Sequence, residues 1–384
     1  MNRYLMTMAL MAMPFVAATA QTIENGQYKF PKDGGTYVGQ LFRGKPNGTG
    51  KTTYPNGDTY EGEYYKGKRQ GHGVYIVNDK NNKIQEMYDG DWFNDLQHGY
   101  GTYTYPNGNR YVGYWYKDFQ ETTAAGDKRE STMYYNNGDK YVGQWSQDMR
   151  SGSGTYTWKN GAEYKGDWLN DKKEGKGLFD WKDGSTYYGD MKNDMRNGYG
   201  EYHYSNGDEY KGMWKNDLMD GKGVYTFANG DKYEGDYLNG KRDGQGIFTY
   251  NGKGKYTGGF KGGMMSGFGT YVWADGSQYV GYWAEDYQNG TGKFTTKEGD
   301  VYDGQWAHGE MNGEGVLRMK DGSKFKGQFV NGKKHGKCVE EDAQGIRFEG
   351  TYVENVRDGK FVEKDRNGKV LHKGTYKRGV PEYD

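Results

Sequence analysis

The chain of 384 residues contains 66 Gly, 39 Tyr and only six Pro, and aromatic residues make up 17% of it. Its mean hydropathy of −1.15 excludes a large aliphatic core, while the aromatic content is too high for an ordinary disordered chain. The 52 Lys and Arg balance the 52 Asp and Glu, so no long-range attraction to nucleic acid or anionic lipid is expected.

The first twenty residues differ in kind from the rest. Asn2 and Arg3 precede an almost wholly apolar run from Tyr4 to Val16, and Ala18-Thr19-Ala20 follows as a small-x-small site. This order predicts a signal peptide over residues 1–20, cleaved before Gln21, and export to the periplasm or beyond the cell. The alternative is an uncleaved N-terminal anchor, although the run is shorter than the roughly 20 residues that a membrane span needs.

A Tyr-x-Gly-x-aromatic pattern recurs along the remainder of the chain. From Tyr141 to Phe348 every step between copies is 23 residues. Such strict spacing indicates one structural unit repeated in tandem. The copies start at Tyr37, Tyr60, Tyr88, Tyr111, Tyr141, Tyr164, Tyr187, Tyr210, Tyr233, Tyr256, Tyr279, Tyr302, Phe325 and Phe348. We therefore expect a capping strand in residues 21–36, the repeat array in 37–360 and a degenerate cap in 361–384.

The copy that starts at Tyr141 shows the expected local structure. Tyr141, Gly143 and Trp145 alternate with other residues, and Gly154, Tyr156 and Trp158 do the same after a short connection. A period of two places each trio on one face of a strand. Without a Cβ on the glycines, Tyr and Trp rings can lie across the backbone and form a continuous aromatic face, opposite a polar face. Asn160-Gly161 then predicts a tight type I′ turn.

These residues resemble the MORN (membrane occupation and recognition nexus) repeat, in a secreted bacterial form. The family pattern is Tyr-x-Gly-x-Trp, a short interval, Gly-x-Gly, an aromatic pair and a turn that contains Gly. The resemblance covers residues 37 to about 360. It implies an all-β protein, an elongated and twisted single antiparallel sheet of β-hairpin repeats. It also implies protein association, including homodimers, and a historical link to lipid contact.

Two stretches depart from the pattern. Residues 76–87 carry five extra residues, and residues 119–137 lack the usual Gly-x-Gly. Each is either a tolerated loop or worn-out repeat, or an insertion that bends the sheet or presents a contact loop.

No motif in the sequence indicates catalysis. The segment Gly44 to Thr52 has five residues where a phosphate-binding P-loop has four, and its glycines stand at repeat positions. None of the six His has another His or a Cys at metal-ligand spacing, and Cys338 is the only Cys, expected as a plain small residue. We therefore expect no cofactor, no metal and no enzymatic activity.

The leading hypothesis is a scaffold that binds a protein partner or itself through the aromatic face. Glycan binding by the same face is the second hypothesis. Membrane-surface association is the third, and the neutral charge balance argues against it. The predicted interaction surface, whose members have intra-sheet packing as their alternative role, consists of Trp92, Trp115, Trp145, Tyr156, Trp158, Trp168, Trp214 and Trp283.

Overall fold

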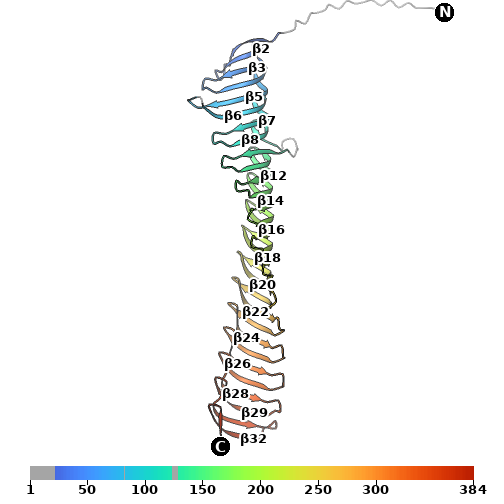
Figure 1. Ribbon diagram of the computed structural model, residues 1–384, viewed down its shortest axis with the longest axis vertical. Helices are drawn as coiled ribbons and strands as arrows, with labels where there is room; N and C mark the ends of the chain where they lie inside the picture. The colour runs from blue at the N-terminus through green and yellow to red at the C-terminus, as the bar shows by residue number, and fades with distance from the viewer. Residues whose placement is uncertain (1–21, 82, 123–128) are drawn as a thin grey trace, which may run out of the picture. The chain divides into compact units, whose positions relative to one another are not determined.

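Every regular element of the computed structural model is a β-strand (Figure 1). The structure describes residues 22–81, 83–122 and 129–384, so the predicted signal peptide lies outside the described residues. Among these residues, no helix is long and apolar enough to span a membrane. Neighbouring strands pair antiparallel and each hairpin repeats the last, which confirms the predicted all-β fold of tandem hairpins.

The chain divides into two compact units, the first ending at Lys159 and the second running from Asn160 to Asp384. Within each unit the strands follow one another in chain order (Figure 1). The strands of unit 1 are β1 Glu24–Lys29, β2 Thr36–Phe42, β3 Lys45–Thr53, β4 Thr59–Tyr65, β5 Lys68–Asn78, β6 Ile84–Phe93, β7 Leu96–Thr104, β8 Arg110–Tyr116, β9 Phe119–Gln120, β10 Ser131–Tyr134, β11 Lys140–Ser146 and β12 Met149–Thr157.

Unit 2 continues the same alternation of a seven-residue and a nine-residue strand. Its strands are β13 Glu163–Leu169, β14 Lys172–Asp180, β15 Thr186–Lys192, β16 Met195–His203, β17 Glu209–Lys215, β18 Leu218–Thr226, β19 Lys232–Leu238, β20 Lys241–Tyr250, β21 Gly254–Lys261, β22 Met264–Trp273, β23 Gln278–Ala284, β24 Tyr287–Thr295, β25 Val301–Ala307, β26 Glu310–Arg318, β27 Lys324–Val330, β28 Lys333–Glu341, β29 Arg347–Val353, β30 Val356–Arg357, β31 Gly359–Lys364, β32 Val370–Lys377 and β33 Val380–Tyr383.

The tight two-residue turn lies at the other connection of each repeat, not at Asn-Gly as the sequence predicted. The two-residue turn with positive φ at both positions is Asn216-Asp217 (φ 48° and 67°), between β17 and β18, and its equivalents. At the Asn-Gly connections only the glycine has positive φ, as at Gly57 (φ 92°). The prediction of type I′ turns at Asn-Gly is therefore wrong.

The Asn-Gly connection is instead a five-residue loop. In Tyr54–Asp58, Gly57 N–H donates to the Tyr54 carbonyl at 3.0 Å and Tyr54 N–H to the Asp58 carbonyl at 2.9 Å. Asn56 Oδ1 accepts the N–H of Asp58 at 3.1 Å. This is a type I turn followed by a left-handed glycine, in which Asn supplies an internal acceptor rather than positive φ.

The two-residue turns hold successive repeats together. Asp217 N–H donates to the Arg196 carbonyl at 3.1 Å, and Asp217 Oδ1 accepts the Arg196 N–H at 2.9 Å. Asp95 makes the same pair of bonds to Arg69, at 3.1 and 2.8 Å. The turn residue of one repeat thus satisfies the backbone at the start of a strand in the repeat before it.

Glycines lie opposite one another from strand to strand and form what we call the glycine ladder. Across unit 2 the paired positions run from Gly166 to Gly350, and in unit 1 from Gly26 to Gly154. Between these bounds, two members in the described strands are not glycine, Ser131 in β10 and Cys338 in β28. The regular glycine positions of the sequence are therefore one continuous feature within each unit.

Both irregular stretches of the sequence fall in unit 1. The extra residues at 76–87 lengthen β5 to 11 residues and β6 to 10, and their hairpin projects from the side of unit 1 (Figure 1). In the stretch 119–137, the short strands β9 and β10 both pair with β8, in the place of one ordinary strand. The loop at its end is ordinary again, because Gly138 N–H donates to the Tyr135 carbonyl as in other repeats.

Candidate functional site

The first aromatic ring of each repeat, Tyr or Phe, closes over the glycine ladder. Tyr210 in β17 is fully buried and its hydroxyl donates to the Met213 carbonyl at 2.9 Å. A Cβ on Gly212 would lie 2.5 Å from both this hydroxyl and the Cα of Gly223. The expectation that glycines let the rings lie across the backbone is confirmed. The face that carries these rings is called the aromatic face.

Six of the eight residues predicted to contact a partner are core residues. Trp92, Trp115, Trp145, Trp168, Trp214 and Trp283 are between 3 and 6% exposed. Tyr156 and Trp158 are half-buried. In this conformation the six buried indoles contribute to packing within the sheet and offer no ring face to a partner.

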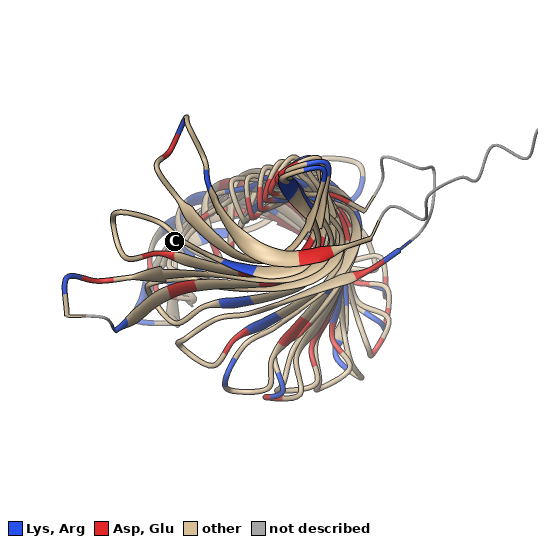
Figure 2. Ribbon diagram, turned by 90° about the horizontal axis from the view of Figure 1, so that it is seen from above, with Lys and Arg blue, Asp and Glu red and all other residues tan. Residues whose placement is uncertain are grey.

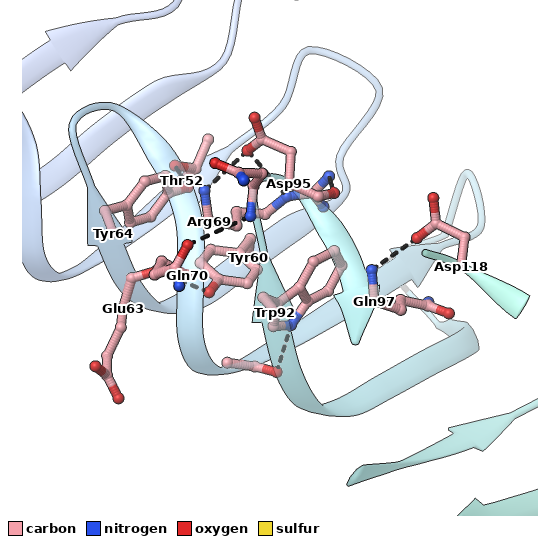
Figure 3. A network of polar contacts seen from close by, with 12 residues as sticks. Thr52, Tyr60, Glu63, Tyr64, Arg69, Gln70, Trp92, Asp95, Gln97 and Asp118 are labelled. Carbon is pink, nitrogen blue, oxygen red and sulfur yellow. Dashed lines mark hydrogen bonds and ion pairs between the residues drawn. The ribbon is translucent and has the colours of Figure 1, made fainter. Parts of the chain in front are cut away.

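Cationic side chains cover several of these rings, a feature that the sequence analysis missed. The Arg69 guanidinium lies 4.1 Å from the centre of the Trp92 ring and 5.7 Å from the centre of the Tyr60 ring (Figure 3). Arg196 lies 4.1 Å from Trp214 in the same way. Each Arg is the second residue after a two-residue turn, and each is fixed by the Asp of the next turn. The Trp that each Arg covers lies about one repeat further along the chain. The local sequence pattern therefore did not reveal the contact.

Several indole N–H groups donate to backbone carbonyls of the preceding repeat. Trp92 Nε1 donates to the Gly73 carbonyl at 2.9 Å, and Trp306 Nε1 to the Gly292 carbonyl at 3.0 Å. Trp145 Nε1 is buried without a hydrogen-bond partner. Trp145 follows the interrupted repeat, where the ordinary strand with its Gly-x-Gly is missing.

Unit 2 presents an unbroken row of rings on the aromatic face, which we call the ring row. Consecutive centroids lie between 4.2 and 5.8 Å apart. All are half-buried except Phe248, which is buried. The row consists of Phe179, Trp181, Tyr202, Tyr204, Tyr225, Phe227, Phe248, Tyr250, Tyr271, Trp273 and Phe294.

In unit 1 the corresponding row is interrupted at Val77. Tyr54 contacts Tyr75 at 5.8 Å and Tyr103 contacts Tyr105 at 4.6 Å, but the position between these pairs carries Val77. The missing ring leaves a cavity of about 500 Å³. It is lined by Arg69, Tyr75, Val77, Glu86, Met87, Tyr88, Trp92, Asp95, Leu96, Gln97, Tyr103 and Asp118.

Polar groups of this cavity are held in place by hydrogen bonds. Arg69 donates from Nη2 to the Asp95 carbonyl at 2.8 Å, and the Asp118 carboxylate accepts the Gln97 N–H at 2.7 Å (Figure 3). The Tyr103 hydroxyl donates to Glu86. Burial, together with the Glu86 carboxylate, raises the pKa of Tyr103, so its hydroxyl stays protonated and acts as a donor at neutral pH.

Charges of both signs are mixed along the strands (Figure 2). On the face opposite the aromatic face, Lys222 pairs with Asp236 and Lys176 with Asp190, each at 2.6 Å. No group of three or more His, Cys, Asp and Glu side chains among the described residues is arranged to hold a metal ion. The thiol of Cys338 is buried, and this burial raises its pKa to about 11.

The family model of the MORN repeat matches twelve stretches, which together make up well over half of the chain. The chain belongs to the MORN-repeat family. The matched residues are 37–59, 60–81, 88–110, 141–163, 164–186, 187–209, 210–232, 233–255, 256–278, 279–301, 302–324 and 325–347. The MORN match omits the interrupted copy at Tyr111 and ends before the copy at Phe348. No curated protein matches the chain.

Several solved structures show a distant likeness to this MORN-repeat chain. The SAS-4 (dCPAP) TCP domain of Drosophila melanogaster, in complex with a proline-rich motif of Ana2, is 18% identical with a TM-score of 0.26, covering 42% of this chain and 85% of its own. The G-box domain of the microcephaly protein CPAP is 11% identical, with a TM-score of 0.27 and coverages of 62% and 100%. A streptogramin B lyase is 11% identical, with a TM-score of 0.13 and coverages of 94% and 89%. Likenesses this weak carry no argument about fold or function.

Proposed function

We propose that this MORN-repeat protein is a non-enzymatic scaffold that associates through its aromatic face, with a second copy of itself as the first partner to test. The observation that carries the proposal is the ring row of unit 2. Ten of its eleven rings keep part of their surface exposed to solvent while they touch one another in sequence. A contiguous apolar surface of this kind usually marks a site of association.

The scaffold we propose is exported, acts in the periplasm or outside the cell, and needs no cofactor or metal. Mixed charge along the strands disfavours nucleic acid and anionic membrane as partners, because neither finds a positive surface there (Figure 2). Membrane-surface association therefore ranks below protein association.

Light scattering after size exclusion, over a range of protein concentrations, tests the proposal. The variant replaces Tyr204, Phe227 and Tyr250 of the ring row by Ser, and we expect it to shift a dimer to a folded monomer. These positions are half-buried, so the change removes exposed ring surface and leaves the tryptophans in place. Thermal melting establishes that the variant is folded.

The matched control replaces three rings on the opposite face, Tyr188, Phe268 and Tyr282, by Ser. These rings are between 51 and 58% exposed, so the control deletes as many aromatic side chains from the face that we do not propose as an interface. A wild-type protein that stays monomeric at all concentrations would contradict self-association, and so would a dimer that only the control variant disrupts.

A further inference from the structure

We infer that the cavity at Val77 in unit 1 is a binding site for a neutral saccharide. Its volume of about 500 Å³ falls within the range of about 300–1,000 Å³ that small-molecule sites occupy. The inference is separate from self-association through the ring row, because it concerns other residues in the other unit.

The cavity combines ring faces with a small apolar side chain. Tyr75 and Tyr103 are half-buried, and the ring that would separate them is replaced by Val77. In unit 2 the equivalent position carries a ring, such as Tyr204 or Phe227. The centre of the Tyr204 ring lies 4.2 Å from that of Tyr202, and the centre of the Phe227 ring lies 4.5 Å from that of Tyr225. An aliphatic C–H face of a sugar ring has the shape and polarity to take the place of the missing aromatic ring.

The polar groups at the cavity suit hydroxyl groups better than charged groups. Glu86, Asp95 and Asp118 against Arg69 give a formal charge of −3 + 1 = −2 among the lining residues. Such a charge repels phosphates, sulfates and uronic acids. Carboxylates accept hydrogen bonds from sugar hydroxyls, and the guanidinium of Arg69 and the amide of Gln97 can donate to them.

Arg69 also argues against a cationic ligand. Its guanidinium lies 5.4 Å from the Tyr75 ring and 4.1 Å from the Trp92 ring, so it already occupies the positions where an incoming cation would meet these rings. The carboxylate of Asp95 in turn forms an ion pair with Arg69, with Oδ1 at 3.7 Å from Nε. A neutral, hydroxyl-rich ring is the ligand that fits both the charge and the remaining ring surface.

The extra residues of the second repeat build one wall. Val77 lies opposite Glu86 in the lengthened β5–β6 hairpin, beyond the last pair of an ordinary repeat. The insertion that the sequence analysis treated as a loop thus supplies both a hydrogen-bonding side chain and the boundary of the cavity.

The test titrates the full-length protein with chitotetraose, maltotetraose and cellotetraose, and follows both heat and tryptophan fluorescence. Tetragalacturonate and tetralysine serve as the anionic and cationic probes. We expect at least one neutral oligosaccharide to bind and both charged probes to bind at least about tenfold more weakly. Absence of binding by all neutral probes at millimolar concentration, or preferential binding of tetralysine, would overturn the inference.

Variant Val77→Tyr restores a ring at the interruption and should lower the affinity for the neutral oligosaccharide at least about tenfold. Val74→Tyr, on the opposite face of β5, is the matched control and should leave the affinity unchanged. If Val77→Tyr does not fold, Glu86→Gln carries the test, because it removes a carboxylate acceptor with little change in volume.

The two proposals fail independently. Val77→Tyr should leave the light-scattering mass unchanged, and the ring-row variant should bind the oligosaccharide as the wild type does. Equal affinity of Val77→Tyr and wild type would overturn the saccharide site even if the protein dimerises as proposed.

Discussion

At the scale of single residues, the fold depends on the absence of side chains as much as on their presence. Gly212 and Gly223 face each other while the Tyr210 ring lies against them, and the space is filled completely. The φ of Gly212 is not positive, so this position does not require the left-handed backbone conformation that favours glycine. The need for glycine here is steric.

We predict that Gly212→Ala destabilises the protein by about 1–3 kcal/mol, the cost typical of overpacking a filled interior. Its Cβ would lie 2.5 Å from two atoms of the structure. Gly322→Ala provides the comparison, because its Cβ would meet nothing within 4 Å but its φ of 94° is strained for Ala. Urea unfolding of both variants checks the prediction. A Gly212→Ala variant as stable as the wild type would show that the Tyr210 ring moves aside without cost.

A cluster of polar side chains around Glu340, on the aromatic face of unit 2, is expected to make the stability of the protein depend on pH. Glu340 accepts hydrogen bonds from Lys334 Nζ at 2.6 Å, Arg357 Nη2 at 2.7 Å and the Tyr352 hydroxyl at 2.7 Å. Burial by itself would raise the pKa of Glu340, but these three donors outweigh burial and hold the pKa below its ordinary value. Its ionised form is therefore favoured in the folded state.

A depressed folded-state pKa gives stability that is present above the unfolded pKa of about 4.3 and is lost as pH falls through the folded value. We predict that Glu340→Gln lowers the free energy of unfolding by about 1–3 kcal/mol at pH 7. The difference from wild type should shrink between pH 5 and pH 3. Denaturant unfolding at these pH values is the measurement.

The exposed Glu234 serves as the control for Glu340. It pairs with Lys232 at 3.3 Å and is 59% exposed, so Glu234→Gln should change stability by less than about 0.5 kcal/mol at any of these pH values. A constant deficit of Glu340→Gln from pH 7 to pH 3 would mean that Glu340 acts through shape and not through charge.

At the scale of strands and turns, the sequence predicted the elements well and their connections less well. The period of two around Tyr141 and the regular glycines predicted both strands of a hairpin and the face of each ring. The turn type at Asn-Gly was predicted wrongly because Asn-Gly is a strong local signal for a type I′ turn, whereas contacts outside the turn decide its conformation. Asp208 shows this, since its carboxylate accepts from the Ala228 N–H at 2.8 Å and the Tyr225 hydroxyl at 2.7 Å, both in the following repeat.

The candidate site was predicted in outline only. The aromatic face itself was predicted correctly, but six of the tryptophans named as contact residues are buried, and Arg69 and Arg196 of the preceding repeats cover two of them. An exposed-looking Arg after a turn gives no sign of this by itself. The cavity at Val77 also required the structure, because it results from a ring that is absent.

At the scale of the whole molecule, the described contacts run mainly between strands that are neighbours in the chain. Strand β17, for example, pairs with β16 and β18. Stability of such an array is close to a sum over repeats and their interfaces.

We predict that a chain lacking residues 210–232 still folds cooperatively, because Tyr233 then takes the place of Tyr210 in an unchanged register. Its calorimetric enthalpy of unfolding should fall by roughly 16 kcal/mol near 60 °C, from the usual 0.7 kcal/mol per residue. Removing only residues 210–220 should abolish cooperative unfolding in unit 2, since that length does not match the repeat. Equal behaviour of the two deletions would contradict a modular array.

The glycine ladder also bears on how such a gene can change. Among the residues that one nucleotide substitution makes from a glycine codon, Ser, Cys and Ala are the smallest, and Asp, Val and Arg are larger or branched. The two members that are not glycine in the described ladder, Ser131 and Cys338, both come from the small group. Ser131 lies within the interrupted repeat, and Cys338 lies opposite Gly327 in the hairpin whose first ring is Phe325, which has no hydroxyl. At Cys338 the added side chain therefore stands where the neighbouring ring lacks a hydroxyl, and we expect larger substitutions along the ladder to need such a change in the crossing ring first.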